Sequence, residues 1–269
     1  MRTIMEVKMQ VPFLSILFMA VSAVICIGLP IALFVFFRKK FDSKTIPMIA
    51  GILAFIIFAL VLESLVHSFV IGKIIIKEKS PALYIIYAVL MAGIFEETAR
   101  LIAYKILKRK YSGIGTGLAY GAGHGGIESV LLAGLSLVFA IVISVMVNTG
   151  SIGIITGRMS GNTLLSINNQ IEVFRATAPY LFLVSGLERL SAIAIQIGLS
   201  VIMFYAVYGE RKLWLYPAAV LLHAIIDTPA ASMQAGVINN IPLVEALAVL
   251  CAALSLFLAW LLHRKFGNV

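Results

Sequence analysis

The sequence predicts an all-α membrane protein, a polytopic bundle of transmembrane helices. Hydrophobic residues make up 61% of the 269 residues and charged residues only 12%, and the mean hydropathy is +1.06. Soluble domains carry about 25% charged residues. A helix needs about 20 apolar residues to cross a bilayer, and seven runs meet this length: 11–37, 46–71, 82–104, 113–147, 178–208, 213–231 and 241–262. We expect one integral membrane domain over 1–269, with a motif-bearing core at about 82–231.

The distribution of Lys and Arg predicts the orientation of these spans. With the N-terminus outside, the inner loops hold 12 of the 21 Lys and Arg residues and the outer segments hold seven. Cytoplasmic loops are enriched in these residues, so seven spans run from N-out to C-in. Such loops face anionic lipid, which explains the net charge of +9 without nucleic-acid binding. We expect a multi-pass protein of the cell membrane.

Three segments need individual interpretation. The first run exceeds the usual apolar length of a signal peptide, about 7 to 15 residues, and we expect it to be retained. The run 113–147 is too long for one upright helix and opens with seven glycines, which predicts either close packing or a break that would give eight spans. The outer segment 148–177 carries apolar residues at helical spacing, which predicts a short amphipathic helix: Leu164, Ile167, Ile171 and Phe174.

Acidic and basic residues occur at helical spacing inside the apolar runs. The groups are Glu63/His67, Glu96-Glu97/Arg100, His124/Glu128 and His223/Asp227. A charged residue at the bilayer centre costs roughly 2.5 to 3.5 kcal/mol on insertion scales. Residues four apart share a helix face, so each pair can point inward together. The pattern predicts a buried polar site.

Counting residues from the inner helix ends sorts these groups by depth. Glu97, His124 and His223 fall at similar depth on three helices and are expected to meet. One turn further outward, Glu128 and Asp227 are expected to orient the two imidazole rings. An outer layer contains Glu63, His67, Glu188 and Arg189. We expect it to serve packing, with Arg189 paired to Glu188 or Glu63, and a proton path is the alternative.

The inner layer suits hydrolysis in two ways that the residues alone leave open. Glu97 can act as general base on a water while His or Arg stabilises the oxyanion. In the other interpretation, His124, His223 and Glu128 bind zinc and leave a fourth position for water. Glu96 points about 100° away from Glu97, so we expect it to pair with Arg100 as a structural clamp.

These residues also carry a resemblance. Phe95-Glu-Glu-Thr-Ala-Arg100, Tyr120-x-x-x-His124 and His223-x-x-x-Asp227 resemble the three motifs of the CAAX-protease and bacteriocin-processing (CPBP) superfamily. The chain is more closely similar to the YhfC family of bacterial intramembrane peptidases, through Gly121-Ala-Gly-His-Gly-Gly-Ile-Glu128 and Gly186-Leu-Glu188-Arg189. In order and spacing the likeness covers roughly 90–230.

The resemblance implies a peptidase that acts on a membrane protein or peptide within the lipid bilayer. Glu97 or Glu96 would activate water with His124, and His223 with Asp227 would assist the oxyanion. Two features depart from the prenyl-protease pattern: Arg100 follows the second glutamate by three residues rather than four, and Asp227 replaces an amide. Both weaken a direct transfer of mechanism.

The cofactor is either zinc or none, and the absence of an H-E-x-x-H motif from the sequence favours the metal-free mechanism. We expect water to reach the site from the cytoplasmic side. Glu and His residues on several helices are also typical of a proton-coupled transporter. A non-catalytic membrane scaffold is the third possibility.

Overall fold

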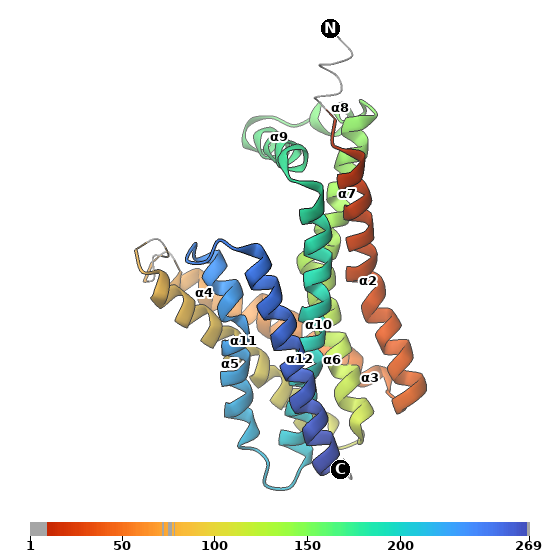
Figure 1. The fold of residues 1–269 in the computed structure, drawn as a ribbon, viewed down its shortest axis with the longest axis vertical. Coiled ribbons are helices and arrows are strands. Elements are labelled where there is room, and N and C mark those ends of the chain that lie inside the picture. The colour runs from red at the N-terminus through yellow and green to blue at the C-terminus, as the bar shows by residue number, and fades with distance from the viewer. Residues whose placement is uncertain (1–9, 72, 75–76, 78, 268–269) are drawn as a thin grey trace. The chain divides into compact units, whose positions relative to one another are not determined.

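The computed structural model describes residues 10–71, 73–74, 77 and 79–267. Helices dominate this part of the chain (Figure 1), which confirms the all-α prediction. In order they are α2 (Phe13–Phe41), α3 (Thr45–Ala54), the π-helix η1 (Phe55–Glu63), α4 (Ser64–Val70), α5 (Pro81–Leu107), α6 (Ile114–Ser129), the π-helix η2 (Val130–Gly134), α7 (Leu135–Asn148), α8 (Gly153–Thr156), α9 (Gly161–Ala176), α10 (Pro179–Tyr208), α11 (Leu215–Gln234) and α12 (Ile241–Phe266).

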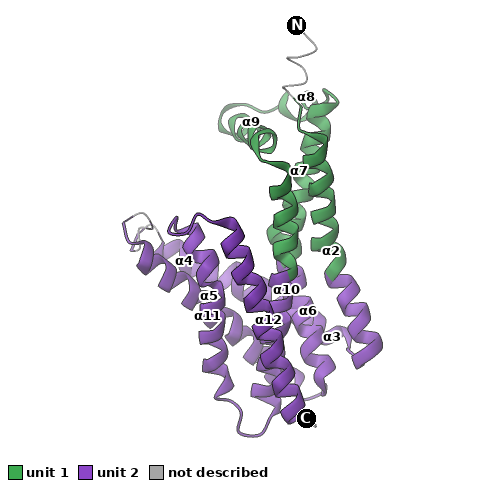
Figure 2. Cartoon of the chain, in the orientation of Figure 1, with its two compact units in different colours: residues 1–29, 129–190 green, residues 30–128, 191–269 purple. Residues whose placement is uncertain are grey.

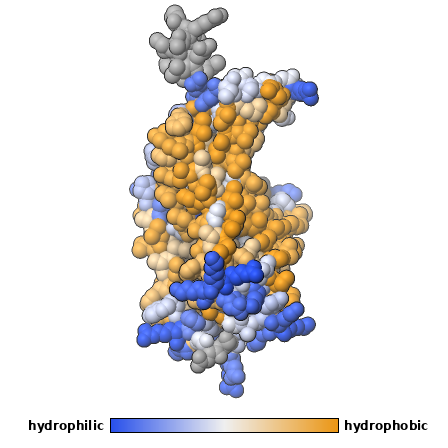
Figure 3. Space-filling view, turned by 90° about the vertical axis from the view of Figure 1, so that its right-hand side faces the viewer, coloured by the Kyte–Doolittle hydropathy of each residue, from blue (hydrophilic) through white to orange (hydrophobic). Residues whose placement is uncertain are grey.

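Six helical segments are long and apolar enough to cross a membrane, so the chain is a multi-pass membrane protein. They are Phe13–Phe41, Thr45–Val70, Pro81–Leu107, Ile114–Asn148, Pro179–Tyr208 and Ile241–Phe266. Hydrophobic residues cover most of the face shown in Figure 3. The seventh predicted run, 213–231, forms α11, which is not among these six segments of the described chain. His223, Asp227 and an internal Pro229 make α11 less apolar than the others.

Local sequence signals explain where several helices begin and end. Pro81 opens α5 in the first turn, where no intrahelical N–H bond is lost. Asn240 caps α12, since its side-chain oxygen accepts a hydrogen bond from the Leu243 N–H at 3.0 Å. Gly113 lies between α5 and α6 with φ +76°, a conformation that glycine adopts without steric cost. Basic residues in the last turns of α2 and α12 complement the negative helix ends.

The two unusual segments of the sequence form helices. Residues 114–148 form one uninterrupted helical segment with a π turn at η2, so the glycines serve packing and do not break the helix. Helix α9 confirms the predicted amphipathic helix: Ile171 is buried, and the other three predicted residues are half-buried. On its opposite side, Leu165 and Val173 are more than half exposed.

The chain divides into two compact units (Figure 2). Unit 1 contains Met1–Leu29 and Ser129–Leu190, and its described core includes Met19, Cys26 and Leu137. Unit 2 contains Pro30–Glu128 and Ser191–Val269. In unit 2, α5 packs along α11 on one side and against α3 and η1 on the other. This arrangement buries the polar residues of α5 between neighbouring helices.

Candidate functional site

Four helices of unit 2 bring acidic, basic and amide side chains together. They are α5, α6, α10 and α11, far apart in sequence but joined by direct hydrogen bonds. The most buried members are Glu97, Arg100 and His124, each 0% exposed, and His223 at 1%. The predicted meeting of Glu97, His124 and His223 therefore occurs within one cluster, although Glu97 and His124 bond to different partners.

Arg100 ties two carboxylates of α5 to helix α10. Its Nη1 donates to Glu97 Oε1 at 2.5 Å, and its Nη2 lies 3.4 Å from Glu96 Oε2. Its Nε donates to Ser200 Oγ at 3.3 Å, and Nη2 also donates to the side-chain oxygen of Gln196. A buried guanidinium is tolerated only when its charge and its donors are satisfied. The predicted ion pair between Arg100 and Glu96 is formed, and Arg100 has a shorter ion pair with Glu97.

His223 lies between carboxylates on two helices. Its Nδ1 is 2.8 Å from Glu97 Oε1, and its Nε2 is 3.4 Å from Asp227 Oδ2 and 3.9 Å from Glu96 Oε2. The predicted contact between His223 and Asp227 is confirmed. The Asp227 side chain is 37% exposed, whereas Glu97 is fully buried. Asp227 is thus the open edge of this cluster.

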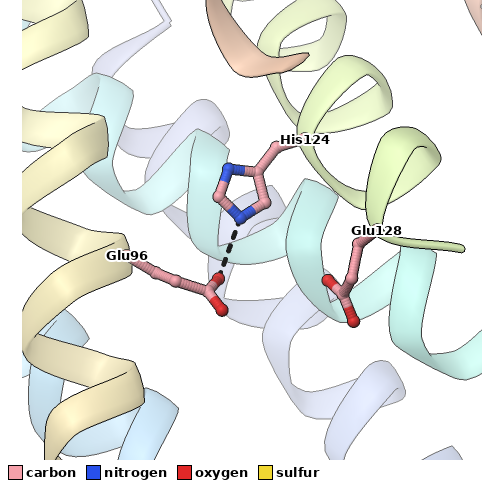
Figure 4. A group of neighbouring side chains, drawn as sticks. All are labelled: Glu96, His124 and Glu128. Atoms are coloured by element: carbon pink, nitrogen blue, oxygen red, sulfur yellow. Dashed lines mark hydrogen bonds and ion pairs between the residues drawn. The ribbon is translucent and has the colours of Figure 1, made fainter. Parts of the chain in front are cut away.

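Glu96 turns the other way, toward helix α6. Its Oε2 is 2.8 Å from His124 Nε2, and Figure 4 shows the side chains of Glu96, His124 and Glu128 pointing toward one another. One ligand atom from each of these three residues lies within 4.8 Å of the other two. The group combines an imidazole nitrogen with two carboxylates, a donor set that zinc accepts.

Gln196 joins the two carboxylates of this group. Its Nε2 donates to Glu96 Oε2 at 3.1 Å and to Glu128 Oε2 at 2.7 Å, so the amide holds the two carboxylates close together. The three residues differ from the predicted ligand set of His124, His223 and Glu128, because Glu96 lies where His223 was expected beside His124. The reason is that the His223 ring is held by Glu97 through Nδ1.

The two neighbouring glutamates have different surroundings. Glu97, the residue expected to act as general base, is fully buried between Arg100 and His223, and its Oε2 has no hydrogen-bond partner among the described residues. Glu96 forms the predicted ion pair with Arg100 at 3.4 Å and makes a shorter contact, of 2.8 Å, with His124. Glu96 is the carboxylate that faces the group able to hold a metal.

Close packing fixes the position of His124. Its ring packs edge-on to Phe55 with centroids 5.3 Å apart and stacks on Tyr120 at 5.9 Å. Tyr120 was predicted as a supporting residue, and this contact agrees with that role. A Cβ on Gly51 of α3 would overlap the backbone of Tyr120 and His124, so only glycine permits this approach of α3 to α6.

Gln196 is a site residue that the sequence interpretation missed. It is 5% exposed and contacts Glu96, Arg100 and Glu128. The prediction relied on acid–base pairs, and a neutral amide does not belong to such a pair. The available signal was an amide inside an apolar run, four residues before Ser200, because a buried amide needs partners.

Glu63 and His67 border this site from the second span. His67 Nε2 is 3.1 Å from Glu63 Oε1, and His67 Nδ1 is 3.0 Å from the Tyr87 hydroxyl. Glu63 is 7% exposed and ends η1, which packs against α5, the helix that carries Glu96. This part of the expected outer layer therefore lies on a neighbour of the helix that carries Glu96.

Glu188 and Arg189 belong to unit 1 and form an ion pair with each other. This agrees with the first of the two partners predicted for Arg189. Glu63, the other partner predicted for Arg189, has a contact with His67.

Comparison with known proteins adds independent information. The profile of the family described as YhfC intramembrane metalloprotease matches residues 25–248. The chain is also similar to the protein named uncharacterized membrane protein YhfC of Bacillus subtilis (strain 168). The two are 38% identical over 256 residues, which cover 93% of this chain and 96% of the relative. No solved structure matches the chain.

Proposed function

Because this chain belongs to the YhfC intramembrane metalloprotease family, we propose that it hydrolyses a peptide bond of a membrane-associated protein or peptide. The observation that carries this proposal is the convergence of the buried Glu96 and His124 with the half-buried Glu128. Ionisable groups inside membrane-spanning helices are costly and by default indicate a functional site.

We further propose that Glu96, His124 and Glu128 hold a zinc ion. A bound zinc supplies Lewis-acid polarisation and a water that ionises near neutral pH. The protein holds these ligands in place through Gln196, which donates to both carboxylates, and through the rings that pack on His124. Outer contacts of this kind commonly orient metal ligands.

His223 is proposed to handle the proton of the reaction. During hydrolysis, the water oxygen bonds to the carbonyl carbon, the C–N bond breaks, and the leaving nitrogen gains a proton. The His223 ring is fixed by Glu97 at Nδ1, while Nε2 lies near Asp227 and 3.9 Å from Glu96. Nε2 is thus placed to donate a proton to the oxyanion or to the leaving amine.

One observation favours a second, metal-free mechanism. The 2.8 Å contact between Glu96 and His124 resembles a base with its orienting partner. In that case Glu96 removes the proton from the attacking water, and His223 assists the oxyanion as above. The two mechanisms use the same residues and differ in whether zinc is required.

The test compares newly formed peptide termini in membranes of cells that express the wild type, Glu96→Gln or Glu172→Gln at equal levels. Glu172 is a matched control, because its side chain is 69% exposed and lies in unit 1. We expect termini in the wild type and the control that vanish in Glu96→Gln. Identical termini in all three intact proteins would overturn hydrolysis and favour transport or a scaffold.

Zinc analysis of the purified proteins separates the two mechanisms. About one zinc per chain in the wild type and none in His124→Ala would support the metallopeptidase. Termini formed by wild-type protein that carries no zinc would instead support Glu96 as the base. In either case Glu172→Gln serves as the control for expression and folding.

A further inference from the structure

A strongly basic cavity lies away from the candidate site, at the C-terminal ends of α10 and α12. Its volume is about 640 Å³, and its charged lining consists of Arg211, Lys212, Arg264, Lys265 and one acid, Glu210. Four cationic side chains and one acidic side chain line the cavity, so its lining carries an excess of positive charge. A cavity of this kind attracts an anion with several acceptor oxygens, such as a phosphate.

The backbone and the aromatic residues hold these cations in place. Arg211 has φ +53°, a left-handed conformation that is uncommon for residues other than glycine and is enriched at binding sites. Lys212 Nζ lies 4.2 Å from the centre of the Phe266 ring, and the Arg264 guanidinium lies 5.5 Å from the Trp260 ring. Such cation–π contacts restrict the side chains that line the cavity.

A separate apolar groove lies before this cavity along α12. Its volume is about 170 Å³, and its lining is contributed by α2, α6, α10 and α12, including Leu118, Val201 and Leu256. Trp260 and His263 also line the groove, and Arg264 and Lys265 follow them directly in the basic cavity. On a helix, residues three and four apart share a face, so the apolar groove and the basic cavity are consecutive on α12.

We infer that the cavity and the groove together bind an anionic phospholipid. The phosphate would lie among the four cations, and one acyl chain would lie along the groove. A free phosphate shares the chemistry of the cavity but leaves the groove without an occupant. A transmembrane peptide would fill the groove but offers no matching anion. Basic pockets between membrane helices are typical of lipid headgroup sites.

The test measures binding of fluorescent phosphatidylglycerol to the purified full-length protein in neutral detergent micelles. The variant replaces Arg211, Lys212, Arg264 and Lys265 by Gln. The matched control replaces Arg38, Lys39, Arg109 and Lys110 by Gln, which removes the same charge from exposed positions outside the cavity. Because the variant loses the four cations that would surround the phosphate and the control keeps them, we expect at least about tenfold weaker binding in the variant and little change in the control.

Further arms distinguish the possible ligands. Phosphatidylcholine should bind at least about tenfold more weakly than phosphatidylglycerol, since the headgroup charge supplies the difference. Leu256→Trp fills the groove from a position that is 41% exposed, so it should weaken lipid binding without disturbing the core. Equal loss of binding in the variant and the control would overturn the proposal. Displacement of the lipid by millimolar inorganic phosphate, or by an uncharged transmembrane peptide, would also overturn it.

Discussion

Arg100 offers the sharpest test of how the buried cluster is stabilised. Its side chain is 0% exposed and contacts Glu97, Glu96, Gln196 and Ser200. Arg100→Met keeps most of the side-chain length and removes the charge and every donor. The two carboxylates then lose their guanidinium partner inside the protein.

The expected effect follows from the contact distances. At an effective dielectric constant of about 20, two unit charges about 4 Å apart interact by about 4 kcal/mol. Removing one partner of a buried ion pair costs about 3 to 5 kcal/mol, because the other charge remains buried and unpaired. We therefore expect Arg100→Met to lower the free energy of unfolding by about 3 to 5 kcal/mol. Replacing both partners, in Glu97→Leu with Arg100→Met, should recover a large part of this loss.

The assay is reversible unfolding in mixed detergent micelles of the wild type, the two single variants and the double variant. The double-mutant cycle gives the coupling energy of the pair directly. A coupling energy below about 0.5 kcal/mol, the range seen for residues that do not interact, would refute the ion pair. A double variant that is less stable than the wild type by the full sum of the two single losses would do the same.

Three other features of unit 2 give measurable expectations. Gly51→Ala places a Cβ against the backbone of α6 and should lower the free energy of unfolding by about 1 to 3 kcal/mol. The control is Gly153→Ala, at a position with open space around it, which should leave the free energy of unfolding unchanged or raise it slightly in the same assay. Gln196→Leu strands buried donors and acceptors and should cost about 1 to 3 kcal/mol in that assay. His124→Ala should abolish zinc binding measured by mass spectrometry, and His67→Ala, outside the ligand group, should retain it; equal zinc contents would contradict the assignment of the ligands.

The apolar runs predict the long helices closely. The predicted run 241–262 becomes Ile241–Phe266, and 178–208 becomes Pro179–Tyr208. Length and hydropathy suffice here because the backbone of a spanning segment must satisfy its own hydrogen bonds, which only a helix does within a single segment. The π turns at η1 and η2 were not predicted, since both lie in almost uniformly apolar runs, where no periodic pattern reveals an extra residue in a turn.

Local spacing predicts which residues of the site share a helix face, but not which way each helix turns. The pairs Glu63/His67 and His223/Asp227 form as predicted because both partners lie on one helix. Whether Glu96 or Glu97 faces α6 depends on the rotation of α5, which is set by packing against α11, α3 and η1. The bonds of Gln196 depend in the same way on the approach of α10 and leave no local pattern in the sequence.

The burial of Glu96, Glu97 and Arg100 in α5 also bears on how the protein enters the membrane. The most apolar 18-residue window of α5 has a mean hydropathy of 1.5, against 2.9 for Ile114–Asn148. The insertion machinery releases a helix into lipid according to its hydrophobicity, and charged residues at its centre oppose release. Arg100 neutralises part of this charge within α5, but the other partners of these side chains lie on α6, α10 and α11, which are synthesised later. We therefore expect stable integration of α5 to depend on the rest of the chain, so that a nascent protein truncated before α11 is retained at the translocon or degraded.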